Sequence, residues 1–144
     1  MKIKDYYTKE SNEYDIKRDK HEYFKIIEDM TKKALSDNIN FNKKIKVLDI
    51  GCGTGRIIDL FKNRKNITAY GIDITPYMLK IAKRKLNKYK NIILNEGNAT
   101  NLPFKDNYFD VIYSFKTLPH VKDMEKALKE IKRVSKKNST ILLE

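Results

Sequence analysis

The chain has 144 residues and a mass of 17.0 kDa, the size of one domain. Hydrophobic residues make up 40% and charged residues 35%, a composition that excludes a disordered or collagen-like chain. A single Cys excludes an internal disulfide framework and a multi-cysteine metal site, and no apolar run is long enough to span a bilayer. We therefore expect a cytoplasmic protein with no metal and no membrane contact.

Positive charge dominates the ionisable residues. Lys and Arg number 31 and Asp and Glu 19, which gives a formal charge of +12. Such an excess attracts anions, including nucleic acid. Almost all of it is Lys, however, whereas Arg is the side chain that contacts bases and phosphates bidentately. The codons of Lys, Ile and Asn are AT-rich, so genome bias also explains the charge, and a nucleic-acid partner is the less favoured alternative.

The N-terminal third of the chain contains an arm and a helix. The first 20 residues are polar and lack a clear periodicity, which predicts a flexible or helical arm; its tyrosines are Tyr6, Tyr7 and Tyr14. From His21 to Asp37 apolar side chains recur at helical spacing, which predicts an amphipathic helix. Because no linker composition follows, we expect residues 21–144 to form one domain after an arm of residues 1–20.

Apolar runs alternate with helical patterns along the rest of the chain. Strands are predicted at 45–50, 67–74, 91–95, 109–115 and 140–143, and helices from Ile57, over 76–90 and over 121–136. This alternation predicts an α/β fold with a parallel sheet covered by helices on both faces. The fifth strand would then lie at an open sheet edge, where a second copy or another chain can pair.

A glycine-rich turn joins the first predicted strand to the next helical pattern, with the sequence Asp49-Ile50-Gly51-Cys52-Gly53-Thr54-Gly55. Glycines at such a place let the backbone approach a ligand closely. Arg56 stands where a dinucleotide fingerprint needs its third glycine, and no P-loop run occurs, which weakens both phosphate-binding hypotheses. Asp73, at the end of the second strand, can accept hydrogen bonds from both hydroxyls of a ribose. The pattern favours a nucleoside without phosphate.

With these residues the chain resembles the class I S-adenosylmethionine-dependent methyltransferases, most nearly the small-molecule branch that includes quinone-biosynthesis enzymes. The other matching segments are Gly71-Ile72-Asp73-Ile74-Thr75, Met78-Leu79, Gly97-Asn98-Ala99, Leu102-Pro103-Phe104, Phe109-Asp110-Val111-Ile112 and Glu130-Ile131-Lys132-Arg133-Val134. The resemblance implies a Rossmann-like sheet of order 3-2-1-4-5. It also implies a further helix and two more strands, which this sequence lacks, so we expect a truncated form of that fold.

The resemblance also implies S-adenosylmethionine as the cofactor and S-adenosylhomocysteine as its product. The turn residues Gly51, Cys52, Gly53 and Thr54 would lie against the methionine part of the cofactor. Asp49 would help to hold the ammonium group, and Asp73 would bind the ribose hydroxyls. Each of these residues also has an ordinary structural explanation when taken alone, and only their joint placement indicates a site.

At the adenine end, the resemblance implies contacts from Ile74 and Met78 on the two faces of the base, although both are also ordinary core residues. Asn98 stands where the family usually has Asp, beside the adenine amino group, with the Ala99 amide adjacent. A neutral amide still accepts through its carbonyl, so we expect weakened adenine selection. Ser114 would offer its backbone carbonyl to the cofactor.

Few residues of the sequence indicate the methyl acceptor, because methyl transfer from an activated sulfonium needs alignment and at most one base. His120, after the fourth strand, is a candidate base, although a histidine at a helix start is the more ordinary explanation. We expect a small-molecule acceptor. The alternatives are a non-catalytic cofactor-binding module or subunit that needs a partner, and an RNA methyltransferase that uses the basic helix at 76–90.

Overall fold

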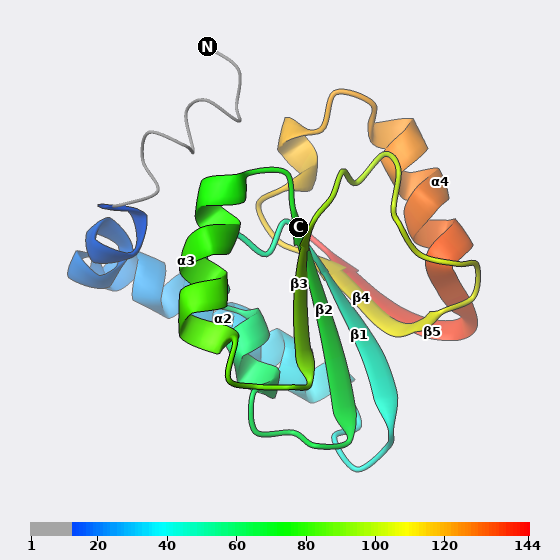
Figure 1. Ribbon diagram of the computed structural model, residues 1–144, viewed down its shortest axis with the longest axis horizontal. Coiled ribbons are helices and arrows are strands. Elements are labelled where there is room, and N and C mark those ends of the chain that lie inside the picture. Colours follow the sequence, from blue (N-terminus) through cyan, green and yellow to red (C-terminus); the bar gives the residue numbers. More distant parts are fainter. Residues whose placement is uncertain (1–12) are drawn as a thin grey trace.

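The computed structural model describes residues 13–144, which form one five-stranded parallel sheet (Figure 1). The strands are β1 (Ile45–Ile50), β2 (Ile67–Asp73), β3 (Ile92–Glu96), β4 (Phe109–Ser114) and β5 (Ser135–Leu143), in the order β3-β2-β1-β4-β5. This confirms the predicted α/β class and strand order. Because all pairings are parallel, the carboxyl ends of the strands meet at one edge of the sheet, where ligands of such folds bind.

Helical elements cover both faces of the sheet, as predicted. The first face carries α2 (Glu22–Asn38), the 3-10 helix η1 (Ile58–Phe61) and α3 (Pro76–Leu86), and the second carries the 3-10 helix η2 (Leu118–His120) and α4 (Met124–Val134) (Figure 1). Residues 13–20 are helical as well. None of the helices within residues 13–144 has the length and hydropathy of a membrane span.

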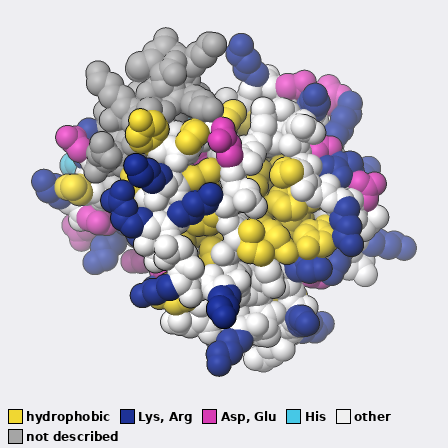
Figure 2. All heavy atoms as spheres, in the orientation of Figure 1, with side chains coloured by type: hydrophobic (Ala, Val, Ile, Leu, Met, Phe, Trp, Pro, Cys, Tyr) yellow, Lys and Arg dark blue, Asp and Glu magenta, His cyan; other side chains and the backbone are white. Residues whose placement is uncertain are grey.

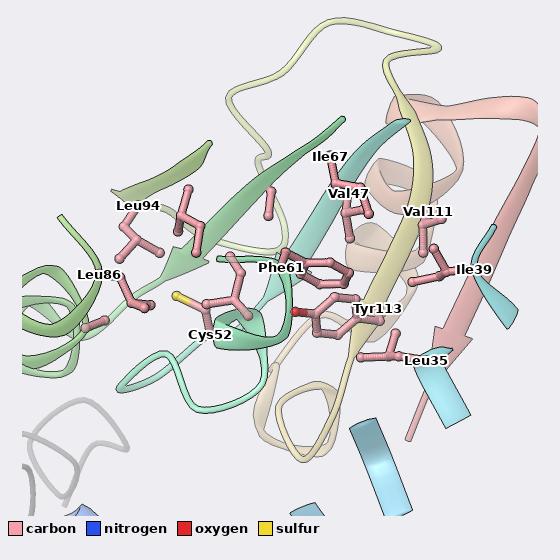
Figure 3. Packing of buried hydrophobic residues seen from close by; sticks show 14 of the residues in the cluster. Leu35, Ile39, Val47, Cys52, Phe61, Ile67, Leu86, Leu94, Val111 and Tyr113 are labelled. Atoms are coloured by element: carbon pink, nitrogen blue, oxygen red, sulfur yellow. The ribbon is translucent and has the colours of Figure 1, made fainter. Parts of the chain in front are cut away.

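The sheet separates two apolar cores. In the first, Phe61 and Tyr113 lie with their ring centroids 6.3 Å apart between β4 and η1, and Leu35 of α2 packs with them (Figure 3). In the second, Ile131 of α4 packs with Phe109 of β4 and other buried side chains. Adjacent residues of one strand pack into opposite cores, since a strand places alternate side chains on opposite faces.

Three of the predicted helical segments have clearly different bounds in the structure. The helical pattern after the glycine turn forms only η1, because the chain turns back at Arg64, whose N–H donates to the Phe61 carbonyl at 2.9 Å. The helix expected at 121–136 begins at Met124, where Asp123 caps it by accepting from the Lys126 N–H, and it ends where β5 begins. The helix expected to reach residue 90 ends at Leu86.

Candidate functional site

The turn after β1 has a backbone conformation that glycine adopts readily. Gly51, Gly53 and Gly55 have φ angles of 81°, 52° and 81°. A Cβ atom on Gly51 would overlap the Thr117 side chain, whereas one on Gly53 would meet nothing within 4 Å. The Gly51 position is therefore closely packed, and the face of Gly53 is open to a ligand.

Asp73 ends β2 beside this turn and is fixed by two backbone donors. Its Oδ2 atom accepts from the Gly53 N–H at 2.8 Å, and its Oδ1 atom accepts from the Thr75 N–H at 2.8 Å. Burial raises the pKa of Asp73 above the ordinary value, although these hydrogen bonds oppose that shift. Each carboxylate oxygen retains a second lone pair, so a ligand with neighbouring hydroxyls can still donate to both.

Asp49 is a buried acid at the start of the same turn, with 4% of its surface exposed. It pairs with Tyr113 in the β1–β4 register, and its Oδ2 atom accepts from the Tyr113 hydroxyl at 2.9 Å. Figure 3 shows this hydroxyl directed toward the side of the core where Cys52 lies. Burial raises the pKa of Asp49 to about 8, with the Tyr113 hydrogen bond opposing the shift and the Asp73 charge adding to it. A cationic ligand group would favour the ionised form.

The residues expected at the adenine end lie after β2 and β3. The Gly97 N–H donates to the Asp73 carbonyl at 3.1 Å and so joins the two segments. Ile74 is 43% exposed, whereas Met78 and Ala99 are buried. Asn98 is exposed, and its Oδ1 atom accepts from both the N–H and the hydroxyl of Thr100. The side-chain carbonyl of Asn98 thus already accepts two hydrogen bonds.

Two further predicted residues lie at the end of β4 and after it. Ser114 is fully buried, and its hydroxyl donates to the Ile50 carbonyl at 2.9 Å. Its own carbonyl accepts from the Glu144 N–H at 3.0 Å, in pairing next to β5, and keeps one lone pair, so its contact with the cofactor stays a prediction. His120 is exposed at the end of η2.

The helical segment at residues 13–20, here called the strap, lies against the glycine turn through ionic contacts. Asp15 accepts from the Thr54 hydroxyl at 2.6 Å and from Lys85 Nζ at 2.9 Å. Arg56 donates to Asp19 at 2.8 Å and, on α2, to Glu28 at 2.6 Å. The expected arm thus includes this ordered helix; Tyr6 and Tyr7 lie outside the described residues.

Sequence reasoning missed several residues of this site. The strap acids and Thr117 lie far from the turn in the sequence and carry no motif, and Tyr113 had no signal beyond its place in an apolar strand. Within residues 13–144 no cluster of His, Cys, Asp and Glu has the arrangement of a metal site.

A cavity of about 100 Å³ lies between the strap and the glycine turn. Its lining includes Tyr14 and Arg18 from the strap, and Asp49, Gly53, Phe115 and Lys116 from the carboxyl ends of β1 and β4. The cavity therefore lies at the sheet edge where ligands of parallel α/β folds bind.

A methyltransferase-domain family matches residues 48–143, which cover the whole sheet from β1 to β5 except the first residues of β1. The chain belongs to this methyltransferase family. An uncharacterized protein of Methanocaldococcus jannaschii is 39% identical over 137 residues, 94% of this chain and 48% of that protein. A demethylmenaquinone methyltransferase of Staphylococcus epidermidis is 34% identical over 115 residues, 77% of this chain and 47% of the relative.

Solved structures show the same fold. A Methanococcus maripaludis protein, described as an S-adenosyl-L-methionine-dependent methyltransferase, has a TM-score of 0.80 at 22% identity, covering 94% of this chain and 62% of that chain. This methyltransferase chain spans about half the length of the curated relatives given above.

S-adenosylmethionine is the methyl donor of this family, and the residues of the site fit it. The open face of Gly53 leaves room for a ligand against the backbone. Asp73 keeps lone pairs for a ribose, and Asp49 is a buried acid with no cationic partner among residues 13–144. The site thus offers Asp73 for the ribose hydroxyls and Asp49 for the ammonium group of a sulfonium nucleoside that carries an amino-acid tail.

Proposed function

We propose that this chain takes part in methyl transfer from S-adenosylmethionine to a small-molecule acceptor. The observation that carries the proposal is the position of Asp73, held at the end of β2 by a 2.8 Å hydrogen bond from Gly53, whose other side is open. The relative named as a demethylmenaquinone methyltransferase, at 34% identity, supports an acceptor of the small-molecule class. When bound, the sulfonium supplies an activated methyl group that a positioned nucleophile can accept.

We assign the donor contacts by position. Asp73 binds the ribose hydroxyls, and the backbone from Gly51 to Thr54 lies along the methionine part, with Asp49 at the ammonium group. Around adenine, exposed Ile74 covers one side, and Met78 and Ala99 form the buried floor. The Asn98 carbonyl is taken by Thr100, so the Asn98 amide donates to a ring nitrogen instead of accepting from the adenine amino group.

His120 is the candidate residue on the acceptor side. It is exposed on η2, directly after the carboxyl end of β4, where an acceptor bound next to the donor methyl would lie. An imidazole side chain at this place can take a proton from a hydroxyl or amine acceptor.

Calorimetric titration of the full chain with S-adenosylhomocysteine tests the donor site. We expect binding to the unmodified chain and a loss of roughly ten-fold or more in affinity for Asp73→Ala, because charged hydrogen bonds to the ribose are lost. Asp73→Asn keeps one acceptor oxygen, so its affinity should fall less than that of Asp73→Ala. Asp59→Asn, at an acid of η1 that pairs with Lys62, is the matched control. Binding that does not depend on Asp73, or binding of NAD alone, contradicts the proposal.

Turnover is tested separately, with demethylmenaquinol and catechol as acceptors and release of S-adenosylhomocysteine as the readout. A chain that binds the donor but releases no product, alone or with a second copy, favours the non-catalytic cofactor-binding alternative. Light scattering on the same samples reports whether the open edge of β5 pairs with another chain.

A further inference from the structure

Helix α3 differs from α2 and α4 in its charged residues. It contains four basic residues and no acid, and two further lysines follow it, so that the segment carries Lys80, Lys83, Arg84, Lys85, Lys88 and Lys90. Helices α2 and α4 are also rich in Lys, but each contains acids as well. A bias toward Lys codons acts along the whole chain and removes no acids from one helix, so it does not account for α3.

Most basic side chains of α3 have no ion-pair partner within residues 13–144. On α2 and α4, several lysines pair with an acid four positions away, as Lys129 does with Glu125 at 2.6 Å. Of the basic side chains at 76–90, Lys85 pairs with Asp15 of the strap at 2.9 Å, and the others form no salt bridge with the described residues. The positive charge of this surface is therefore not neutralised by the described part of the chain.

Four of these cations lie on one side of the helix. The spacing places them on one helical face, and we call them the basic stripe: Lys80, Lys83, Arg84 and Lys88. All four are exposed, and Asn87, which precedes the last of them, keeps helical backbone angles. Figure 2 shows Lys and Arg side chains gathered around α3. The stripe therefore presents a row of unneutralised charges to solvent.

An exposed aromatic ring continues the basic stripe toward the carboxyl edge of the sheet. Tyr77, in the first turn of α3, has 51% of its surface exposed and lies three positions before Lys80. A hollow of about 290 Å³ lies beside Lys80 and is lined by Pro76, Leu79, Lys80, Lys83 and Glu96. Because Glu96 is the acid of that lining, phosphates are expected on the side of the lysines. Single-strand-binding proteins combine such a positively charged groove with aromatic rings on which bases stack.

We propose that the basic stripe binds single-stranded RNA, with its four cations at backbone phosphates and Tyr77 stacked on a base. Three of the cations are lysines, which act on phosphates as point charges and read no base sequence. RNA is the favoured partner because its loops and ends offer unstacked bases that an aromatic side chain can reach. None of these side chains is assigned to the donor, so the inference stands apart from the proposed function.

A lipid surface fits these observations less well. A helix that lies in a membrane interface inserts its apolar face among the acyl chains. The apolar face of α3 is already packed into the first core through Leu79, Ala82 and Leu86. The outward face offers charges and an exposed ring, which suffice for a strand of nucleic acid.

Fluorescence anisotropy with a labelled single-stranded RNA of about 12 nucleotides measures the contact. Each neutralised phosphate of a single strand adds roughly −0.7 to the slope of log affinity against log salt concentration, so four contacts predict a slope of about −3. The affinity should then fall roughly 50-fold between about 50 and 200 mM salt. Thermal melts check that every variant is folded.

Two triple variants with the same loss of charge separate the stripe from the net charge. The test variant replaces three lysines of the stripe: Lys80→Gln, Lys83→Gln and Lys88→Gln. It leaves one cation of the stripe, so the salt slope should shrink to roughly −0.7. The control replaces three exposed lysines of α4: Lys126→Gln, Lys129→Gln and Lys132→Gln. It should keep the slope of the unmodified chain, and both variants should bind S-adenosylhomocysteine equally well.

The stacking contact is tested through Tyr77 alone. Tyr77→Leu should lower the affinity for the single strand about five-fold or more, which is the loss of one stacked base, and Tyr77→Phe should keep the affinity. A duplex RNA of the same length should bind more weakly than the single strand, because its bases are stacked within the helix.

Several results would overturn the inference. Equal losses in the two triple variants would mean that the net charge alone attracts RNA. An unchanged affinity in Tyr77→Leu, or equal affinity for the duplex, would mean that no base stacks on the ring. Binding to vesicles of phosphatidylserine and phosphatidylcholine that depends on the stripe, without RNA binding that depends on it, would assign the surface to a membrane.

Discussion

At the scale of single residues, the turn after β1 holds an acid in an environment that disfavours its charge. Asp49 is surrounded by the apolar core, accepts one hydrogen bond from Tyr113, and lies near the second acid, Asp73. These surroundings raise the pKa of Asp49 to about 8, against 3.8 for an unperturbed aspartate. Between these two values the folded chain retains a proton that the unfolded chain releases.

This pKa predicts how stability depends on pH. Because the folded state binds more protons in that window, the Asp49 contribution to the free energy of unfolding falls as pH rises from about 4 to about 8, by about 1.4 kcal/mol per pH unit at most. Asp49→Asn cannot ionise, so its stability relative to the unmodified chain should increase over the window and level off above it. Urea denaturation of both proteins at several pH values measures the difference; a difference that stays constant with pH would show that Asp49 ionises normally.

At the scale of elements, the local patterns of the sequence predict the strands well, and long-range contacts limit the rest. Strands β1, β2 and β4 follow β-branched and apolar runs, which are typical of strands buried on both faces. Strand β5 begins five residues before the predicted start, because Ser135 pairs with Phe109 ahead of a bulge although residues 136–139, which follow it, are polar. Pairing partners of this kind are set by the fold and leave no periodicity in the sequence.

Some residues of the candidate site can be predicted from local sequence patterns, and others depend on long-range contacts. The glycines and Asp73 could be predicted, since a turn between a strand and a helical pattern is a local signal. The role of Tyr113 depends on the β1–β4 register, which sets it opposite Asp49. The strap contacts join Asp15 to Lys85, 70 positions apart, and ion pairs at such separations cannot be inferred from one sequence.

Ion pairs of Arg56 hold the strap against the glycine turn and α2. Arg56 contacts Asp15, Asp19 and Glu28 while its side chain is only 20% exposed, so these contacts are partly shielded from solvent. Arg56→Met should lower the free energy of opening of residues 13–20 by about 1–3 kcal/mol, since charged hydrogen bonds are lost. Hydrogen exchange of the strap amides should accelerate accordingly, with no change in α4.

The control for the strap is Lys129→Met, which removes an exposed pair with Glu125 on α4 and should leave strap exchange unchanged. Raising the salt concentration to about 1 M, where the Debye length is roughly 3 Å, should bring the unmodified chain closer to Arg56→Met. Strap exchange that does not respond to Arg56→Met would mean that apolar contacts, not the ion pairs, hold the segment.

At the scale of the whole molecule, one sheet separates two cores that share no side chains. Figure 2 shows one face of the molecule, on which Lys and Arg side chains gather around α3 and leave an apolar area beside them. The basic side chains of α3 are exposed, whereas Leu79, Ala82 and Leu86 of this helix pack into the first core. The basic side chains of α3 thus lie at the surface, and the two apolar cores hold the sheet from both sides.

This arrangement predicts that the two cores contribute independently to the stability of one cooperative unit. Ile58 of η1 and Ile131 of α4 are both buried, in the first and second core respectively. Ile58→Val and Ile131→Val should each lower the free energy of unfolding by about 0.5–1.5 kcal/mol. The double variant should lose the sum of the two to within about 0.5 kcal/mol, because the sheet lies between the sites.

A second pair within one core makes the comparison decisive. Ile131 and Val134 lie one turn apart on α4 in the same core, so Ile131→Val combined with Val134→Ala should deviate from additivity by more than the pair split across the sheet. Urea denaturation followed by both circular dichroism and Tyr fluorescence gives the free energies and tests for a single transition. Strong coupling across the sheet, or separate transitions for its two faces, would show that the sheet does not act as a rigid divider between independent cores.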